Sequence, residues 1–165
     1  MAGPNDTLRE VQRYSLVEVD REKGLSRLTR DGRPLGFVAN GVVLEAQYEL
    51  RDGRGLVWLT ADCPYEEGLH VYLLGPGGEV EDVVEAGAMY APGILKIRAA
   101  GADWVEVGFF LNGFVYRLEI GERARLRMPL PIGWRYGRWL ARHRLSVTVS
   151  RTEPTVDDPE PTEGP

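Results

Sequence analysis

The sequence has a single cysteine, Cys63, among its 165 residues. One thiol cannot form an intramolecular disulfide, which excludes the small disulfide-stapled secreted domains. The N-terminus lacks the apolar segment of a signal peptide, and no run approaches the ~20 apolar residues that a transmembrane helix needs. These absences favour a cytoplasmic protein with no membrane partner.

The chain also lacks an excess of charge outside its C-terminal end. The formal net charge is −5, and residues 151–165, with five acidic residues and Arg151, contribute −4 of it. The rest is nearly neutral and gives no general argument for nucleic-acid binding. Residues 151–165 also hold four prolines, and we expect them to form a mobile tail because they have too little apolar surface to offset the entropy of ordering. A chain of this length predicts one domain (residues 13–150) between an N-terminal arm (1–12) and the tail (151–165).

Alternation of apolar and polar residues runs through most of this domain. In residues 42–50 every second side chain is apolar, which is typical of a strand with one buried face. Residues 56–61 and 69–74 are more uniformly apolar and are expected to be central strands. With turn signals between such segments, the sequence predicts an all-β fold, an antiparallel meander of about 10–12 short strands with at most two short helices. One short helix or an irregular crossing segment fits residues 133–143.

The order of the turns favours closure of this meander into a barrel, and a two-sheet sandwich is the alternative. Asp31-Gly32, Asn40-Gly41 and Asn112-Gly113 each predict a two-residue hairpin turn, because Asn, Asp and Gly reach positive φ at little cost. The last turn would place Val107 opposite Leu118, on an apolar face, and Glu106 opposite Glu119, on the other face.

The first candidate site is the loop at residues 62–70, which collects the only cysteine, one of two histidines and three carboxylates. An enzyme of the hydrolase or transferase type would be centred on Cys63, His70, Asp62 and Glu66. The spacing of Cys63 and His70 matches no zinc pattern, so we expect neither a metal nor a cofactor. If the loop binds a ligand without catalysis, Tyr65 and His70 are the candidates. The structural alternative is a small buried thiol with carboxylates that cap or solvate a turn.

The second candidate site is the segment 133–144, with four arginines, three large aromatic residues and no acidic residue. Guanidinium groups and aromatic rings together suit an anionic partner, and the candidate ligand-binding residues are Trp134, Arg135, Trp139 and Arg142. Alternatively, the tryptophans close one end of the fold while the arginine stems lie over its edge. The acidic tail is expected to screen or compete for this segment.

The third candidate site is the interior of the expected barrel, where a small apolar ligand would be held among Tyr48, Trp58, Tyr72, Phe109 and Tyr116. The alternative is that these rings fill the core.

We therefore expect a non-catalytic binding or interaction module, with an apolar-ligand barrel and the Cys63 enzyme as alternatives. A small ligand or a protein is expected as partner in preference to nucleic acid. A homodimer through exposed edge strands is also considered.

Overall fold

The structure is a computed structural model that describes residues 7–63, 66–89, 91–139 and 141–153. Its described residues form strands and no helix, so the predicted all-β class is confirmed. None of the described segments is a helix long and apolar enough to cross a membrane. In chain order the strands are β1 (Arg9–Glu10), β2 (Tyr14–Asp20), β3 (Leu25–Arg30), β4 (Arg33–Asn40), β5 (Val43–Glu49), β6 (Gly55–Thr60), β7 (Leu69–Leu74), β8 (Val80–Ala86), β9 (Gly93–Ala100), β10 (Trp104–Phe110), β11 (Phe114–Leu126), β12 (Trp134–Tyr136) and β13 (Arg142–Thr152).

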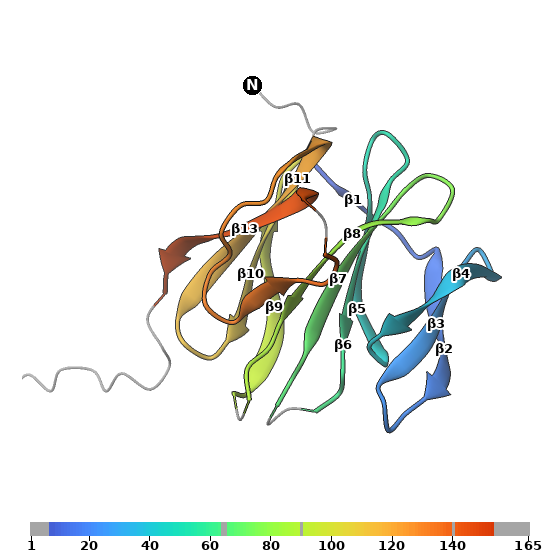
Figure 1. Cartoon of the computed structure of the whole chain (residues 1–165), viewed down its shortest axis with the longest axis horizontal. Coiled ribbons are helices and arrows are strands. Elements are labelled where there is room, and N and C mark those ends of the chain that lie inside the picture. Colours follow the sequence, from blue (N-terminus) through green and yellow to red (C-terminus); the bar gives the residue numbers. More distant parts are fainter. Residues whose placement is uncertain (1–6, 64–65, 90, 140, 154–165) are drawn as a thin grey trace, which may run out of the picture.

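The strands form three antiparallel sheets. The central sheet has the order β1-β5-β6-β7-β8-β12, the C-terminal sheet β13-β11-β10-β9 and the N-terminal sheet β2-β3-β4. In Figure 1 the C-terminal sheet lies to the left of the central sheet and the N-terminal sheet to its right. Each outer sheet therefore covers one face of the central sheet.

The expected barrel is wrong, because none of the three sheets closes on itself. The sandwich alternative describes the central and C-terminal sheets, and the N-terminal sheet adds a further layer. The physical reason lies in β6, whose six residues are all buried. A strand that is apolar on both faces needs a layer on each side, whereas a small barrel covers each strand from the inside only.

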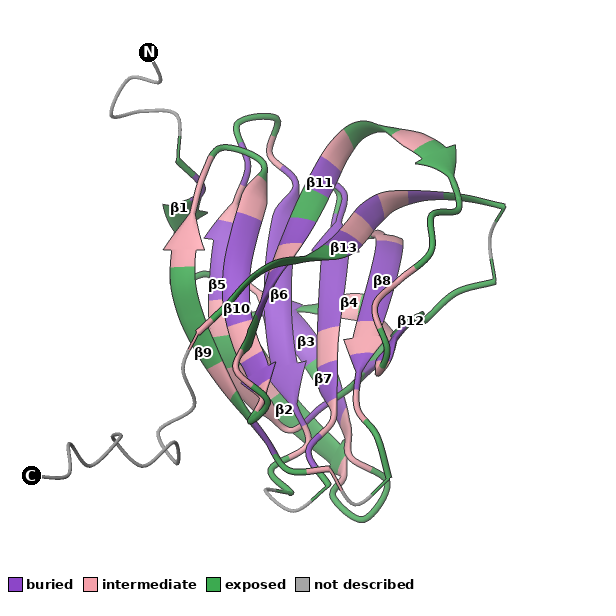
Figure 2. Cartoon of the chain, turned by 90° about the vertical axis from the view of Figure 1, so that its left-hand side faces the viewer, coloured by how far each residue is buried: buried purple, intermediate pink, exposed green. Residues whose placement is uncertain are grey.

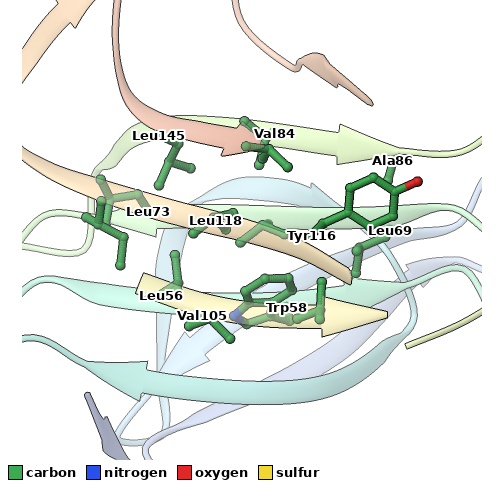
Figure 3. Packing of buried hydrophobic residues seen from close by; sticks show 14 of the residues in the cluster. Leu56, Trp58, Leu69, Leu73, Val84, Ala86, Val105, Tyr116, Leu118 and Leu145 are labelled. Atoms are coloured by element: carbon green, nitrogen blue, oxygen red, sulfur yellow. The ribbon is translucent and has the colours of Figure 1, made fainter. Parts of the chain in front are cut away.

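Two hydrophobic cores follow from this layering, and Figure 2 shows the buried residues along central strands such as β6. The main core lies between the central and C-terminal sheets, and Figure 3 shows part of its packing. Its members include Leu56, Trp58, Leu69, Val84, Val105, Phe109, Tyr116, Leu118 and Leu145. The second core joins the N-terminal sheet to the other face of the central sheet, through Tyr14, Leu28, Ala39, Val57, Leu59, Tyr72 and Leu74.

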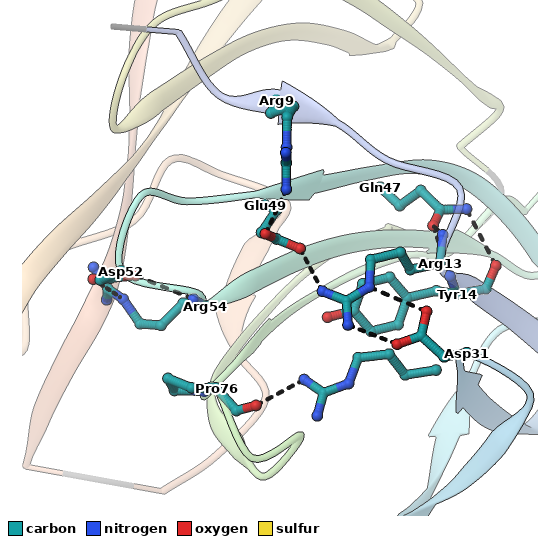
Figure 4. A network of polar contacts seen from close by, with 10 residues as sticks. Arg9, Arg13, Tyr14, Asp31, Gln47, Glu49, Asp52, Arg54 and Pro76 are labelled. Atoms are coloured by element: carbon teal, nitrogen blue, oxygen red, sulfur yellow. Dashed lines mark hydrogen bonds and ion pairs between the residues drawn. The ribbon is translucent and has the colours of Figure 1, made fainter. Parts of the chain in front are cut away.

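A polar network fixes the N-terminal sheet to the central sheet (Figure 4). The side-chain oxygen of Gln47 on β5 accepts hydrogen bonds from the backbone N–H groups of Arg13 and Tyr14, at 2.9 and 2.8 Å. The Arg13 guanidinium donates to Asp31 on one side and to Glu49 on the other. The start of β2 is thus held at a defined place on β5.

The three predicted turns have different outcomes. Asp31-Gly32 is confirmed as a hairpin turn, with φ of 52° and 77° between the paired strands β3 and β4. The Asn40-Gly41 prediction is wrong, because β4 and β5 belong to different sheets and do not pair. Here the chain turns out of the N-terminal sheet, and Val42 donates its N–H to the carbonyl of Thr60 on β6.

The hairpin at Asn112-Gly113 forms, but its predicted register is wrong by two residues. Val107 lies opposite Tyr116, and Glu106 lies opposite Arg117. Gly113 has φ of 75° while Asn112 does not have positive φ; instead its side chain accepts from the N–H of Phe114. The paired part of the two strands therefore ends earlier than predicted, and their connection is longer than a two-residue turn. Because side chains alternate with period two, this shift leaves the predicted apolar face intact.

Residues 133–143 form neither a helix nor a purely irregular segment where they are described. Strand β12 pairs with β8, and β13 begins at Arg142. Short as it is, β12 places Trp134 and Tyr136 in the main core at one edge of the central sheet.

Candidate binding surface

The loop before β7 is held together by one carboxylate. Glu67 accepts hydrogen bonds from the backbone N–H groups of Ala61, Cys63 and Gly68, at 2.7, 3.2 and 3.1 Å. Asp62, on the same loop, has φ of 57°, and its carboxylate lies 3.4 Å from the guanidinium of Arg21. Cys63 is exposed, in contrast to the buried thiol of the structural interpretation. Tyr65 lies outside the described residues.

His70 does not lie on this loop but on β7, beside Glu85 of β8. Its Nδ1 is 3.3 Å from Glu85 Oε1, and Arg135 on β12 donates from Nε to Glu85 Oε2 at 2.8 Å. These contacts, with His70 first, hold the pKa of Glu85 below its ordinary value. Glu85 belonged to neither of the two sites predicted from the sequence. It nevertheless contacts one residue of each site, His70 and Arg135.

The described residues contain no group of three or more His, Cys, Asp or Glu side chains placed to hold a metal ion.

The two tryptophans of the segment 133–144 have opposite environments. Trp134 is 6% exposed and packs in the main core, with its ring centroid 5.3 Å from that of Tyr116. Trp139 is 91% exposed. Trp134 thus closes an edge of the sandwich. The structural interpretation expected the same of Trp139, which instead faces solvent.

Trp139 and Arg142 lie beside the exposed end of β11, which the sequence did not single out as part of a site. Leu126 pairs with Arg142, and the Arg127 N–H donates to the carbonyl of Ala141. The Arg127 guanidinium lies 4.9 Å from the ring centroid of Trp139. We name this region the arginine–apolar surface and define it by Arg125, Leu126, Arg127, Met128, Trp139 and Arg142. Figure 2 shows the exposed end of β11 and the chain that leads from it to β12.

A cleft of about 240 Å³ opens beside this surface, between the end of β11 and the start of β13. Arg125, Leu126 and Met128 line it, together with Tyr136 and His143. Asp103 and Glu119 also line this cleft, so its wall carries both signs of charge.

A buried pair of side chains, Asp82 and His143, lies next to the cleft. The side chains of Asp82 and His143 are 0% and 1% exposed, and Asp82 Oδ1 lies 2.9 Å from His143 Nδ1. Asp82 also accepts from the backbone N–H groups of Arg144 and Leu145. Tyr136 stacks on the His143 ring at 3.7 Å between centroids and donates its hydroxyl to the carbonyl of Met128. The backbone under the arginine–apolar surface is therefore held at the start of β13 and at Met128, just beyond the end of β11.

Charge is strongly concentrated in this part of the chain. Residues 123–144 contain seven arginines and no acidic residue, so they carry +7, and the remaining residues carry −12 to give the net −5. Arg135 is bound to Glu85, Arg144 to Glu81, and Arg138 to the carbonyl of Val80. Within the described part of the chain, the side chains of Arg123, Arg125 and Arg142 make no ion pair. Their charge is available to a partner.

A second depression, of about 340 Å³, lies at another place on the surface and is almost wholly apolar. Its lining includes Ala88, Pro92, Phe110, Leu111 and Ile132. The rings expected to line a ligand cavity lie instead in the packed cores: Tyr48, Trp58, Phe109 and Tyr116 in the main core, Tyr72 in the second.

Arg123, Arg125 and Arg127 alternate with apolar residues, a pattern typical of a strand with one buried face, yet Leu126 and Met128 are 68% and 55% exposed. The sequence signal for this surface is a run of arginines with no acidic residue among them. This run begins at residue 123, ten residues before the segment singled out from the sequence. Comparison of the chain with protein-family models, with curated proteins and with solved structures gave no significant match, so the surface is interpreted from its own geometry.

Proposed function

We propose that this protein is a non-catalytic binding module whose partner is anionic and apolar and binds at the arginine–apolar surface. One observation carries the proposal. Leu126, Met128 and Trp139 are 68%, 55% and 91% exposed beside arginines that make no ion pair with the described residues.

Exposed apolar side chains are unfavourable in water, and these side chains and the unpaired arginines would both be stabilised by contact with a suitable partner. Large apolar side chains that gather on a surface with a polar rim mark sites of association. Arginine is weakly hydrated for a cation and presents a planar fork of donors that matches carboxylate and phosphate groups. A partner with anionic and apolar groups therefore gains from both kinds of side chain.

The support under the surface also suits a binding role. Asp82 and His143 lock the start of β13, and Tyr136 holds the backbone at Met128. A surface whose backbone is already ordered loses little entropy when a partner binds.

The test uses Trp139 itself as the probe. Trp58 and Trp134 are buried and Trp104 is half-buried, so quenching by acrylamide reports mainly on Trp139. We expect poly-L-glutamate, titrated at low salt, to protect Trp139 from acrylamide. The double variant R125S/R142S should bind at least tenfold more weakly. The double variant R27S/R33S, which removes the same charge from exposed positions on the N-terminal sheet, should bind within twofold of the wild type.

Absence of any binding by the wild-type protein at low salt would contradict the proposal. An equal loss in both double variants would also contradict it, since binding would then follow total charge and not this surface.

A further inference from the structure

We propose that the partner is the surface of an anionic phospholipid bilayer, on which the protein rests peripherally through the arginine–apolar surface. This inference depends on the proposed function and names the partner class. The absence of a spanning run led us to expect no membrane partner, but peripheral attachment requires no such run.

The arrangement of the exposed apolar side chains favours a bilayer over a folded protein. Arg127 separates Leu126 from Met128 along the chain, and its guanidinium lies over the Trp139 ring. The cleft lined by Leu126 and Met128 also carries Asp103 and Glu119. A protein partner needs a surface of complementary shape, whereas lipid chains part around single side chains.

Trp139 has the environment of an interfacial residue. Its ring lies under the Arg127 guanidinium, so an apolar ring and a cation occupy the same place on the surface. Tryptophan collects at the level of the lipid headgroups because its ring is apolar and its N–H is polar. Arginine stems can likewise lie along apolar surface while the charged ends remain among phosphates.

The distribution of charge would orient the molecule on such a bilayer. Of the arginines in residues 123–144, Arg135 and Arg144 are bound to Glu85 and Glu81, whereas Arg123, Arg125 and Arg142 make no ion pair within the described part of the chain. An anionic surface attracts these three side chains, and each arginine near the lipid headgroups strengthens binding. The net charge of −5 would not predict this attraction, which depends on where the unpaired arginines lie.

Vesicle binding tests the inference. The full chain is mixed with vesicles of phosphatidylcholine alone and of phosphatidylcholine with about one-third phosphatidylserine, and bound protein is measured by flotation. We expect partition into the anionic vesicles to be at least tenfold stronger, with a blue shift of Trp139 emission and a loss of binding at high salt.

Two serine variants separate insertion from simple charge attraction. W139S should lower partition into anionic vesicles about tenfold, as measured by flotation. V17S removes an exposed apolar side chain from the N-terminal sheet and should leave this partition within twofold of the wild type. If W139S binds vesicles as well as the wild type, attachment is by charge alone and the inference is wrong.

Three further outcomes would overturn the lipid partner. If poly-L-glutamate binds and anionic vesicles do not, the proposed function stands and the bilayer is excluded. If neither binds, both proposals fail together. If a peptide of glutamate and leucine residues, or a single-stranded oligonucleotide, binds more tightly than the vesicles and with the same dependence on Trp139, the partner belongs to that class instead.

Discussion

At the residue scale, Glu106 is the buried charge on the outer face of the C-terminal sheet. It is 4% exposed, and its carboxylate accepts hydrogen bonds from Arg117 and Ser150, at 2.8 Å each, and from Arg151. Contact with Arg117 first, then with Ser150 and Arg151, holds the pKa of Glu106 at about 2. A buried carboxylate with this many donors stabilises the fold only while it is ionised.

The first prediction concerns acid. Because the folded pKa of Glu106 lies below its unfolded value near 4.5, its contribution is complete above pH 4.5 and is lost as the pH falls towards about 2. Glu106→Gln should therefore lower the free energy of unfolding at pH 7 by about 2–3 kcal/mol. This difference from the wild type should shrink between pH 4.5 and 2, as measured by urea unfolding at several pH values.

Glu22 supplies the matched control for this measurement. It is exposed in the turn between β2 and β3, and Glu22→Gln should change the free energy of unfolding by less than about 0.5 kcal/mol. A difference between Glu106→Gln and the wild type that stays constant from pH 7 to pH 2 would show that ionisation of Glu106 is not what stabilises the sheet.

Glu106 also shows what could and could not be predicted from the sequence for a single residue. Alternation correctly placed Glu106 on the face opposite to Val105 and Val107. The predicted partner of Glu106 was wrong, because the register depended on the geometry of the connection between β10 and β11. Likewise, composition found both Trp134 and Trp139, but only the short strand β12 decides that Trp134 points inward while Trp139, beyond Gly137, points out.

At the element scale, the connection between β4 and β5 carries the second prediction. Gly41 has φ of 129°, and a Cβ at this position would lie 2.5 Å from Leu59 Cβ in the second core. Gly41→Ala therefore strains the backbone and pushes β5 away from β6. We expect a loss of about 2–4 kcal/mol in the free energy of unfolding, measured by chemical denaturation.

Gly36→Ala is the matched control, because a Cβ on Gly36 of β4 would have no atom within 4 Å and its φ is not positive. Its effect should stay within about 0.5 kcal/mol of the wild type. Equal effects of the two alanine variants would mean that close packing on Leu59 does not constrain this connection.

Gly41 also explains why the second hairpin prediction failed. An Asn-Gly pair reports that the backbone can turn through positive φ, and at Asp31-Gly32 this was enough to identify a hairpin. Whether the strands on either side then pair depends on where their apolar faces are buried. Here β4 covers one face of the central sheet and β5 belongs to that sheet, so the same dipeptide becomes a crossing between layers.

At the scale of the whole molecule, the sequence indicated that β6 and β7 are central, since both are apolar on consecutive residues. It did not indicate which segments supply the two covering layers. That assignment depends on contacts distant in the chain, such as those of Leu28 and Ala39 with the second core. The arginine–apolar surface likewise depends on a contact distant in the chain, because it joins the end of β11 to the start of β13.

The overall shape also bears on the acidic residues that follow β13. Strand β13 begins at Arg142, within the arginine–apolar surface, and ends at Thr152, about 33 Å away for a strand of 11 residues. Glu153 is bound to Arg98 at 2.8 Å, so the remaining chain departs from the far end. A segment of 12 residues, the length of 154–165, spans at most about 40 Å when fully extended.

The third prediction follows from these lengths. Removal of residues 154–165 eliminates four acidic side chains but, at physiological salt, should change the affinity for poly-L-glutamate by less than about twofold, because charges more than about 8 Å apart are screened. At low salt the truncated chain should bind severalfold more tightly, since long-range repulsion is then removed. The truncation must spare Arg151, which is bound to Glu106. A gain of tenfold or more at physiological salt would instead mean that the acidic residues occupy the arginine–apolar surface directly, from the same chain or from a second copy.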